Sequence, residues 1–142
     1  VKVTVFGPVV NLASRLESMT RRLNATILLD EATADRIRRE APREVARVRR
    51  LAKVRPFGLE TPLLVSELLP PASVYPQLTD EHLACYESAL DAFLLGDWSR
   101  AFELLHAIPA DDRAKDFLTL QITRSNRTPP AGFDGVIGLE SK

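Results

Sequence analysis

The hydrophobic pattern of the chain changes at a proline-rich stretch, "LPPASVYPQ", at residues 69–77. Before it, short apolar runs typical of strands alternate with helical patterns, and after it the apolar residues recur only at helical spacing. Three prolines within seven residues favour a stiff, extended connector. The sequence therefore predicts a mixed part at residues 1–69, a proline-rich linker at 70–78 and a helical part at 79–142.

The first part has the order strand, helix, strand, helix, strand, strand. The predicted strands are "VKVTVF" (1–6), "ATILLD" (25–30), "VARVRRLAKV" (45–54) and "PLLVSELL" (62–69). One helix is capped by Asp30, and the other follows the Gly7-Pro8 break with its apolar face at Leu12, Leu16, Met19 and Leu23. This order predicts an α+β or α/β sandwich in which helices pack on a sheet, and α+β is the class that we expect.

The second part reads as three helices. Thr79 caps the first, which ends at Gly96, and Asp97 caps the second, so the two form a helical hairpin. A third helix is predicted from about Asp111 to Arg124, and its inward residues would be Ala114, Phe117, Leu118 and Gln121. Residues 127–142 are predicted to be loop, and Tyr86, Phe93 and Trp98 to be core.

The formal net charge of zero hides an asymmetry along the chain. Residues 1–59 hold 13 Lys/Arg against 6 Asp/Glu, and residues 60–142 hold 6 against 13. Either the basic half meets an anionic partner or the two halves attract each other. The basic run from Arg36 to Arg55 is interpreted as a solvated face rather than a nucleic-acid groove, because no aromatic residues lie among its charges for bases to stack on.

Composition also restricts the setting of the chain. No apolar run approaches the ~20 residues of a membrane span, and the first residues lack a signal-peptide pattern. The one cysteine, Cys85, has no intramolecular disulfide partner, and His82 and His106 stand too far apart to suggest a metal cluster. We expect a cytoplasmic protein whose chain contains no membrane segment and whose residues form no metal site.

Asn11 and Arg15 lie one helical turn apart on the polar stripe of the first predicted helix. The stretch "TVFGPVVNLASRLE" that contains them resembles the signature of the class III adenylate and guanylate cyclases. Downstream, "ATILLDEAT" and "VRPFGLETPLLVSEL" resemble the following strand, helix start and closing hairpin of that family. The resemblance covers about the first 69 residues and implies the C-terminal half of a ferredoxin-like cyclase domain.

The resemblance assigns roles to four residues. It implies that Asn11 orients the ribose of the nucleotide and that Arg15 faces the α-phosphate, a task that suits an always-charged, planar guanidinium. Thr4 would contact the purine edge, as in the bacterial branch of the family with Thr at that position, which favours ATP over GTP. Arg55 would contact the terminal phosphates, although Pro56 replaces the usual glycine after it, and Pro8 stands where Asp or Asn is common.

The resemblance also implies what lies outside this chain. In the family, the N-terminal half of the domain carries two Asp residues that bind two divalent metal ions, Mg²⁺ or Mn²⁺. Head-to-tail pairing then brings that half of one protomer to the Asn/Arg half of another. We therefore expect a homodimer that converts ATP to cyclic AMP and pyrophosphate, and expect this chain alone to be inactive.

The stretch "YESALDAFLLGDWSRAFELL" resembles the tetratricopeptide-like helical extension that bacterial cyclases of this type can carry. It would offer a surface to a protein partner. The rival interpretation is a non-catalytic, cyclase-like dimerisation module, in which Asn11 is a helix cap and Arg15 a surface charge. The sequence leaves open the activating signal and whether the parent protein is anchored in a membrane.

Overall fold

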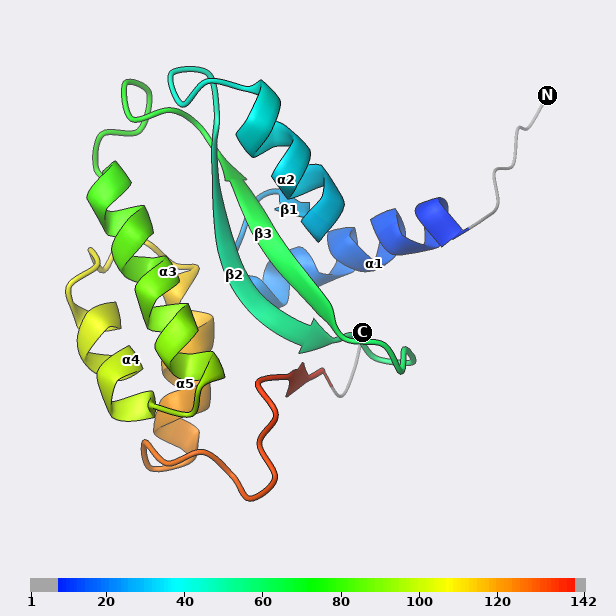
Figure 1. The fold of residues 1–142 in the computed structure, drawn as a ribbon, viewed down its shortest axis with the longest axis vertical. Helices are drawn as coiled ribbons and strands as arrows, with labels where there is room; N and C mark the ends of the chain where they lie inside the picture. Colours follow the sequence, from blue (N-terminus) through cyan, green and yellow to red (C-terminus); the bar gives the residue numbers. More distant parts are fainter. Residues whose placement is uncertain (1–7, 140–142) are drawn as a thin grey trace.

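The computed structural model describes residues 8–139, and the side chains of residues 12–139. The chain folds as a mixed α+β structure (Figure 1). Its elements in order are α1 (Pro8–Leu23), β1 (Leu28–Leu29), α2 (Glu31–Glu40), β2 (Arg47–Arg55), β3 (Leu63–Leu69), α3 (Asp80–Leu94), α4 (Trp98–His106), α5 (Lys115–Arg124) and β4 (Ile137–Gly138). The predicted order of elements is confirmed from α1 to α5, while the predicted strand at residues 1–6 lies outside the described residues.

The four described strands form one mixed sheet in the order β1-β3-β2-β4. Strand β3 runs antiparallel to both β1 and β2, and β2 and β3 keep a regular register, with Val48 opposite Leu68, until a bulge between Arg50 and Ala52. Strand β4 runs parallel to β2, beside Val54 and Arg55. The prediction of loop throughout residues 127–142 was therefore wrong. A two-residue strand has no periodicity of its own, and its partner lies more than 80 residues earlier in the chain.

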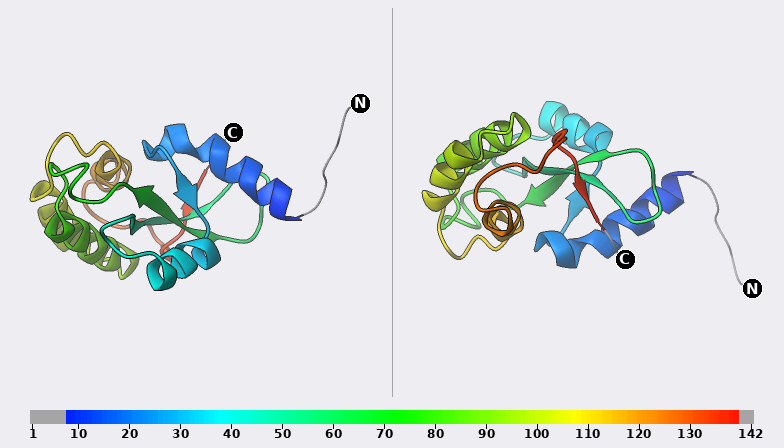
Figure 2. Two further views of the ribbon diagram at one scale, coloured as in Figure 1. Left: turned by 90° about the horizontal axis from the view of Figure 1, so that it is seen from above. Right: turned by 90° about the horizontal axis from the view of Figure 1, so that it is seen from below.

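Helices cover both faces and one edge of the sheet. Figure 2 shows α1 and α2 on opposite sides of it, with α5 on the side of α1. Helix α3 lies along β2, and α4 packs against both α3 and α5. Within residues 8–139, none of the helices combines the length and the apolar character needed to cross a membrane.

The predicted capping residues start three of the helices. The side chain of Asp30 accepts the amide of Thr33 at α2, and that of Asp97 accepts the amide of Arg100 at α4. At α3, Thr79 and His82 exchange two hydrogen bonds in a capping box, which satisfies two amides that have no partner within the helix. Local sequence therefore sets where these helices begin.

Two details of the third predicted helix were wrong. Helix α5 begins at Lys115 rather than near Asp111, because Asp111–Ala114 form turns, and no side chain caps its start. Ile122 is fully buried, whereas Gln121 is only half-buried. The apolar face of this helix therefore includes Ile122 in place of Gln121.

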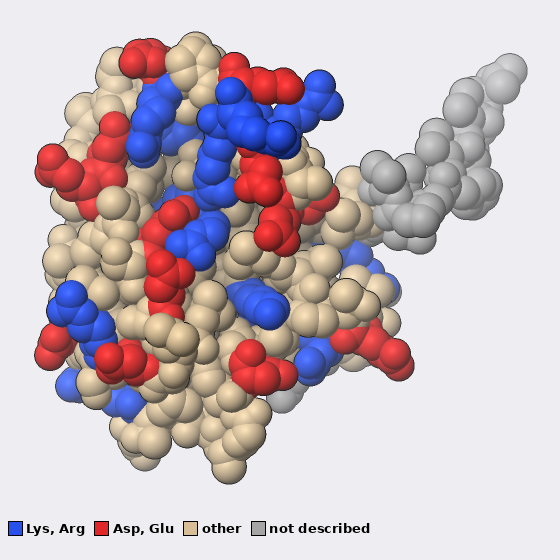
Figure 3. All heavy atoms as spheres, viewed as in Figure 1, with Lys and Arg blue, Asp and Glu red and all other residues tan. Residues whose placement is uncertain are grey.

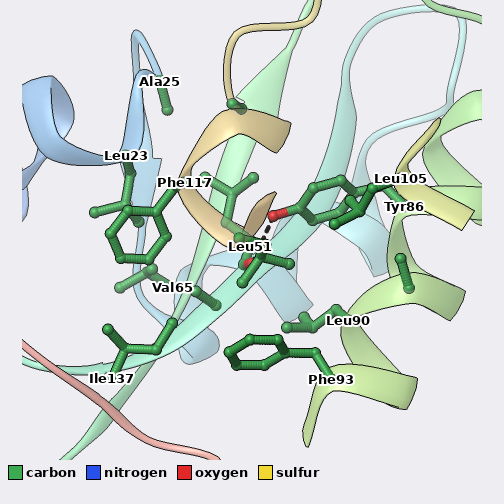
Figure 4. Packing of buried hydrophobic residues seen from close by; sticks show 14 of the residues in the cluster. Leu23, Ala25, Leu51, Val65, Tyr86, Leu90, Phe93, Leu105, Phe117 and Ile137 are labelled. Atoms are coloured by element: carbon green, nitrogen blue, oxygen red, sulfur yellow. Dashed lines mark hydrogen bonds between the residues drawn. The ribbon is translucent and has the colours of Figure 1, made fainter. Parts of the chain in front are cut away.

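One hydrophobic cluster contains residues from both sides of the 70–78 stretch. In Figure 4, Leu51 and Val65 of the sheet lie among Tyr86, Leu90 and Phe93 of α3 and Phe117 of α5. The Tyr86 hydroxyl donates a 2.8 Å hydrogen bond to the backbone carbonyl of Leu51. The helical part thus shares one hydrophobic core with the sheet.

An aromatic stack closes one end of this core. The rings of Phe93 and Trp98 are stacked with centroids 4.8 Å apart, and Phe133 meets both edge-on, at 5.4 and 5.1 Å. Each such pair stabilises the folded state by roughly 0.5–1.5 kcal/mol beyond the contribution of the apolar surface that the rings bury. The expectation that Tyr86, Phe93 and Trp98 are core residues is confirmed, since each is at most 4% exposed.

The interpretation of the basic run as a solvated face was wrong for two of its arginines. Arg47 and Arg49 are 2% and 1% exposed. Arg47 donates to the backbone carbonyls of Pro70 and Leu78, at 2.8 and 2.7 Å, and to the Asp80 carboxylate at 3.1 Å. Arg47 is the first residue of β2, so these hydrogen bonds hold the proline-rich stretch and the start of α3 against the beginning of that strand.

Arg49 lies between two buried carboxylates and an aromatic ring. Its Nη2 is 2.6 Å from Glu67 Oε1 and 2.8 Å from Asp112 Oδ1, and its Nη1 is 2.6 Å from Asp112 Oδ2. The guanidinium carbon also lies 4.7 Å from the centre of the Tyr86 ring. This bidentate geometry satisfies the charge of a residue that would otherwise be very costly to bury.

The pKa values of this cluster shift in the directions that the geometry requires. Burial acts to lower the pKa of Arg49, but the hydrogen bond to Asp112 and the charges of Glu67 and Asp112 outweigh it and raise that pKa. Burial also raises the pKa of the Tyr86 phenol. Arg49 is therefore a permanent cation and Tyr86 a permanent hydrogen-bond donor.

These contacts answer the question posed by the charge asymmetry. Ion pairs join the basic first half to the acidic second half at Arg38–Glu87, Arg43–Asp80, Arg47–Asp80, Arg49–Asp112, Arg50–Glu87 and Arg50–Asp91. The two halves attract each other within one chain, so the asymmetry requires no external anion.

We expect Arg49→Met to destabilise the chain by about 3–5 kcal/mol at neutral pH, because it leaves two buried carboxylates without their cation. Urea unfolding followed by circular dichroism measures the loss. Arg36→Met is the matched control, since its pair with Glu40 is exposed and should change the free energy of unfolding by less than about 0.5 kcal/mol. Equal losses in the two variants would show that the buried cluster does not hold the fold.

Glu67 should make the stability of the chain pH-dependent. Burial raises the pKa of the Glu67 carboxyl above its ordinary value of 4.5, and the nearby Arg49 only partly offsets this effect. The folded state therefore keeps a proton that the unfolded state releases, so the contribution of Glu67 is greatest below pH 4.5 and is lost as the pH rises through the folded pKa.

The measurement compares the free energy of unfolding of wild type and Glu67→Gln from pH 4 upward. The wild type should lose stability relative to the variant as the pH rises. Glu103→Gln removes an exposed carboxylate on α4 and serves as the control. A difference that grows in favour of the wild type with rising pH would contradict the assignment.

Candidate functional site

The four predicted site residues differ in how far the structure describes them. Thr4 lies outside the described residues. The backbone of Asn11 belongs to α1, one turn before Arg15, as predicted, but its side chain is outside the described part. Arg15 and Arg55 are described in full, so the geometry of the site is built from these two.

Arg15 reaches from α1 to the loop between β2 and β3. Its Nη1 donates a hydrogen bond to the backbone carbonyl of Phe57, 42 residues away in the sequence. The side chain is half-buried, and within the described part of the chain this is the one hydrogen bond recorded for its guanidinium. The remaining N–H groups can therefore take further acceptors.

The loop that receives Arg15 is a tight turn formed by residues 56–59. The amide of Leu59 donates to the carbonyl of Pro56 at 3.0 Å, and Gly58 has φ +82° at the third position of the turn. These are the features of a type II turn, in which a positive φ at that position favours glycine. The turn brings the Phe57 carbonyl to the side where the Gly58 side chain would stand, and Arg15 occupies that side.

The guanidinium of Arg15 lies beside Gly58. A Cβ placed on Gly58 would lie 3.5 Å from Nη2 and 3.6 Å from Nη1 of Arg15, which is ordinary van der Waals contact. The turn therefore supplies an acceptor for Arg15, and glycine is favoured at residue 58 by its positive φ rather than by the space that the guanidinium needs. Sequence reasoning placed a loop at Pro56 and Gly58 but did not predict that it holds Arg15.

Arg55 is the last residue of β2 and lies directly before this turn. Its side chain is exposed, and its backbone carbonyl accepts the amide of Leu139 at 2.9 Å, beside β4. The structure therefore brings Arg15 to the turn that follows Arg55. It records no contact between the two side chains.

The recess beside Arg15 is small. It is lined by Arg15, Ser18, Met19, Arg22, Pro56, Phe57 and Leu139, and it has room for about one water molecule. The residues that the structure describes do not by themselves enclose a nucleotide here. Any ligand of Arg15 would lie on an open surface of the described residues, and a further protein surface would have to cover it to form an enclosed site.

The other residues with reactive side chains have structural roles. His82 completes the α3 capping box, the Nδ1 of His106 lies 2.9 Å from the carbonyl of Phe102, and Cys85 donates to the carbonyl of Leu104 at 3.3 Å. Among the described residues, no three His, Cys, Asp or Glu side chains come together as a group that could hold a metal ion.

The buried Arg49–Glu67–Asp112 cluster was missed from the sequence. One signal was present, because Arg47 and Arg49 share the period-2 face of β2 with Leu51, which is a core position. Alternation alone does not distinguish an arginine that is buried with partners from one that is solvated.

No protein-family model, curated protein or solved structure matches this chain significantly. The resemblance of residues 1–69 to the class III cyclases and that of residues 79–142 to a tetratricopeptide-like unit therefore stay predictions.

Substitution of Gly58 tests the geometry around Arg15. We expect Gly58→Ala to destabilise the chain by about 1–2 kcal/mol, because an L-residue pays for a positive φ. Gly132→Ala is the matched control, since Gly132 has φ +75° and no atom within 4 Å of its would-be Cβ.

The two variants should lose similar stability in urea unfolding. A Cβ 3.5 Å from Arg15 is an ordinary van der Waals contact and requires no movement of the guanidinium. A much larger loss in Gly58→Ala would contradict the described position of Arg15.

Proposed function

We propose that this chain supplies the Asn/Arg half of a shared active site in an adenylate cyclase, which converts ATP to cyclic AMP and pyrophosphate. The proposal rests first on the spacing of Thr4, Asn11 and Arg15 around the Gly7-Pro8 break. It also rests on the resemblance of residues 1–69 to the class III cyclases. The expected partners are ATP and a second protomer in head-to-tail orientation.

The structural observation that best supports the proposal is the hydrogen bond between Arg15 and the Phe57 carbonyl. An arginine that stabilises a transition state must be aimed before the reaction, since ordering a flexible side chain costs free energy. Helix α1 fixes the backbone of Arg15, and the turn at residues 56–59 fixes its guanidinium group. The same turn follows Arg55, so both proposed phosphate-binding cations belong to one local structure.

The chemistry that these residues would perform is electrostatic. Attack of the ribose 3′ oxygen on the α-phosphorus increases charge on the α-phosphate oxygens, and a guanidinium can donate two hydrogen bonds to them. Asn11, one turn earlier on the same helix, would hold the ribose with its amide. Two divalent ions, held by the half of the domain outside this chain, would neutralise the triphosphate.

The shape of the surface around Arg15 favours an active site that two protomers form together. Within the part of the chain that the structure describes, the recess beside Arg15 encloses no nucleotide-sized volume, and the N-terminal end of α1 extends away from the body of the protein (Figure 1). A second protomer that packs against α1 would provide the missing wall. The proposal therefore includes dimerisation as a condition for activity.

We expect Arg15→Ala in the full-length protein to lower cyclic AMP production from ATP by about 10³-fold or more, with either Mn²⁺ or Mg²⁺. Arg15→Lys should recover little of the activity, because an ammonium lacks the planar fork. Arg21→Ala, an exposed arginine on the same helix, is the matched control and should retain activity. Absence of cyclic AMP production by the wild type with both metals would contradict the proposal.

A second candidate function is a non-catalytic dimerisation module with a helical interaction hairpin. The observation that favours it is the same contact, since an arginine that holds a turn also has a purely structural use. This function predicts that Arg15→Ala weakens dimerisation or stability in a protein that makes no cyclic AMP. Analytical ultracentrifugation of the wild type and the variant distinguishes it from the enzyme.

A further inference from the structure

A groove separates α2 from α3 on the face of the molecule opposite α1. Its volume is about 350 Å³, which lies within the range of sites for small ligands, roughly 300–1,000 Å³. Its lining includes Arg38, Arg43, Ala46, Val48, Leu83 and Ala84. Small and aliphatic side chains from three elements form its walls, and charged side chains stand among them.

Two ion pairs bridge the groove. Arg38 of α2 lies 3.3 Å from the Glu87 carboxylate of α3, and Arg43, in the turn before β2, lies 3.7 Å from Asp80 at the start of α3. Helices α2 and α3 are therefore connected by long charged side chains as well as by packing. Figure 3 shows Lys and Arg side chains interspersed with Asp and Glu over the region of α2 and α3.

Both carboxylates of the groove already have cationic partners. Glu87 accepts hydrogen bonds from Arg38 and from the backbone amide of Arg50, at 3.3 and 2.8 Å, and also pairs with the Arg50 side chain. Asp80 accepts a 3.1 Å hydrogen bond from Arg47. Neither carboxylate needs a further cation.

Arg43 is the group with capacity for a ligand. Its side chain is 64% exposed, and its 3.7 Å approach to Asp80 is longer than a hydrogen bond. Within residues 12–139, no hydrogen bond from its guanidinium is recorded. The other two arginines of the lining are already engaged, Arg47 by backbone carbonyls and Asp80, and Arg38 by Asp35 and Glu87. The capacity of the groove to bind an anion therefore lies in Arg43.

We propose that the groove between α2 and α3 binds a small aliphatic carboxylic acid. Its carboxylate would accept hydrogen bonds from Arg43, and its hydrocarbon chain would lie on Ala46, Val48, Leu83 and Ala84. A guanidinium binds a carboxylate through two parallel hydrogen bonds, which fixes the orientation of the ligand. The apolar walls favour a ligand with several methylene groups, because each buried methylene improves affinity by about fourfold.

The experiment titrates the ¹⁵N-labelled chain with hexanoate and follows backbone amide shifts by NMR. Acetate tests the need for the hydrocarbon chain, and hexylammonium tests the need for the negative charge. We expect saturable shifts around Ala46, Val48 and Ala84 with hexanoate, and affinity at least tenfold weaker for acetate and hexylammonium.

Two variants test the residues of the groove. Arg43→Gln should weaken hexanoate binding by about tenfold or more, and Ala84→Leu, which fills the groove from the exposed side of α3, should abolish it. Arg100→Gln removes an exposed arginine on α4, which contributes no residue to the groove, and should bind hexanoate as the wild type does.

Three results would overturn the proposal. They are shifts that do not saturate, equal binding of hexanoate and hexylammonium, and hexanoate binding that Arg43→Gln leaves unchanged. Because Arg43 is exposed in a turn, its substitution tests the site even where Ala84→Leu perturbs folding.

Discussion

The buried Arg49 cluster is the interaction on which the rest of the structure depends. It joins β2 to β3 through Glu67 and the sheet to the turns before α5 through Asp112. Tyr86 of α3 covers the guanidinium and bonds to Leu51, so three separate parts of the chain meet at one cation. Since a buried charge is costly unless its partners are in place, the cluster favours the arrangement in which Glu67, Asp112 and Tyr86 all reach Arg49.

The same principle operates with less burial elsewhere on β2. Arg47 holds the proline-rich stretch, and Arg50 pairs with Glu87 and Asp91 of α3. Arg47 and Arg50 therefore both connect β2 to α3, Arg47 at the first residue of the helix and Arg50 further along it. The helical part is held to the sheet by charge complementarity as well as by a shared hydrophobic cluster, which explains how two oppositely charged halves form one structure.

Arg15 and Arg43 differ from these arginines because each retains donors for a ligand. Arg15 is anchored by one carbonyl on an open surface, where it is suited to a shared site with a second protomer. Arg43 stands at the edge of a groove whose carboxylates are already bound to other arginines. The two lie in separate parts of the molecule, since the recess at Arg15 and the groove between α2 and α3 share no lining residue.

The sequence by itself determined the helix starts at Asp30, Thr79 and Asp97, the β2–β3 pair and the aromatic core, because caps and hydrophobic periods act over a few residues. It also placed Asn11 and Arg15 one turn apart on α1. Only the tertiary structure decided that Arg47 and Arg49 are buried, that β4 joins β2, and that the Phe57 carbonyl holds Arg15. Each of these depends on partners distant in the chain, and such partners become neighbours only when hydrophobic burial has brought the layers together.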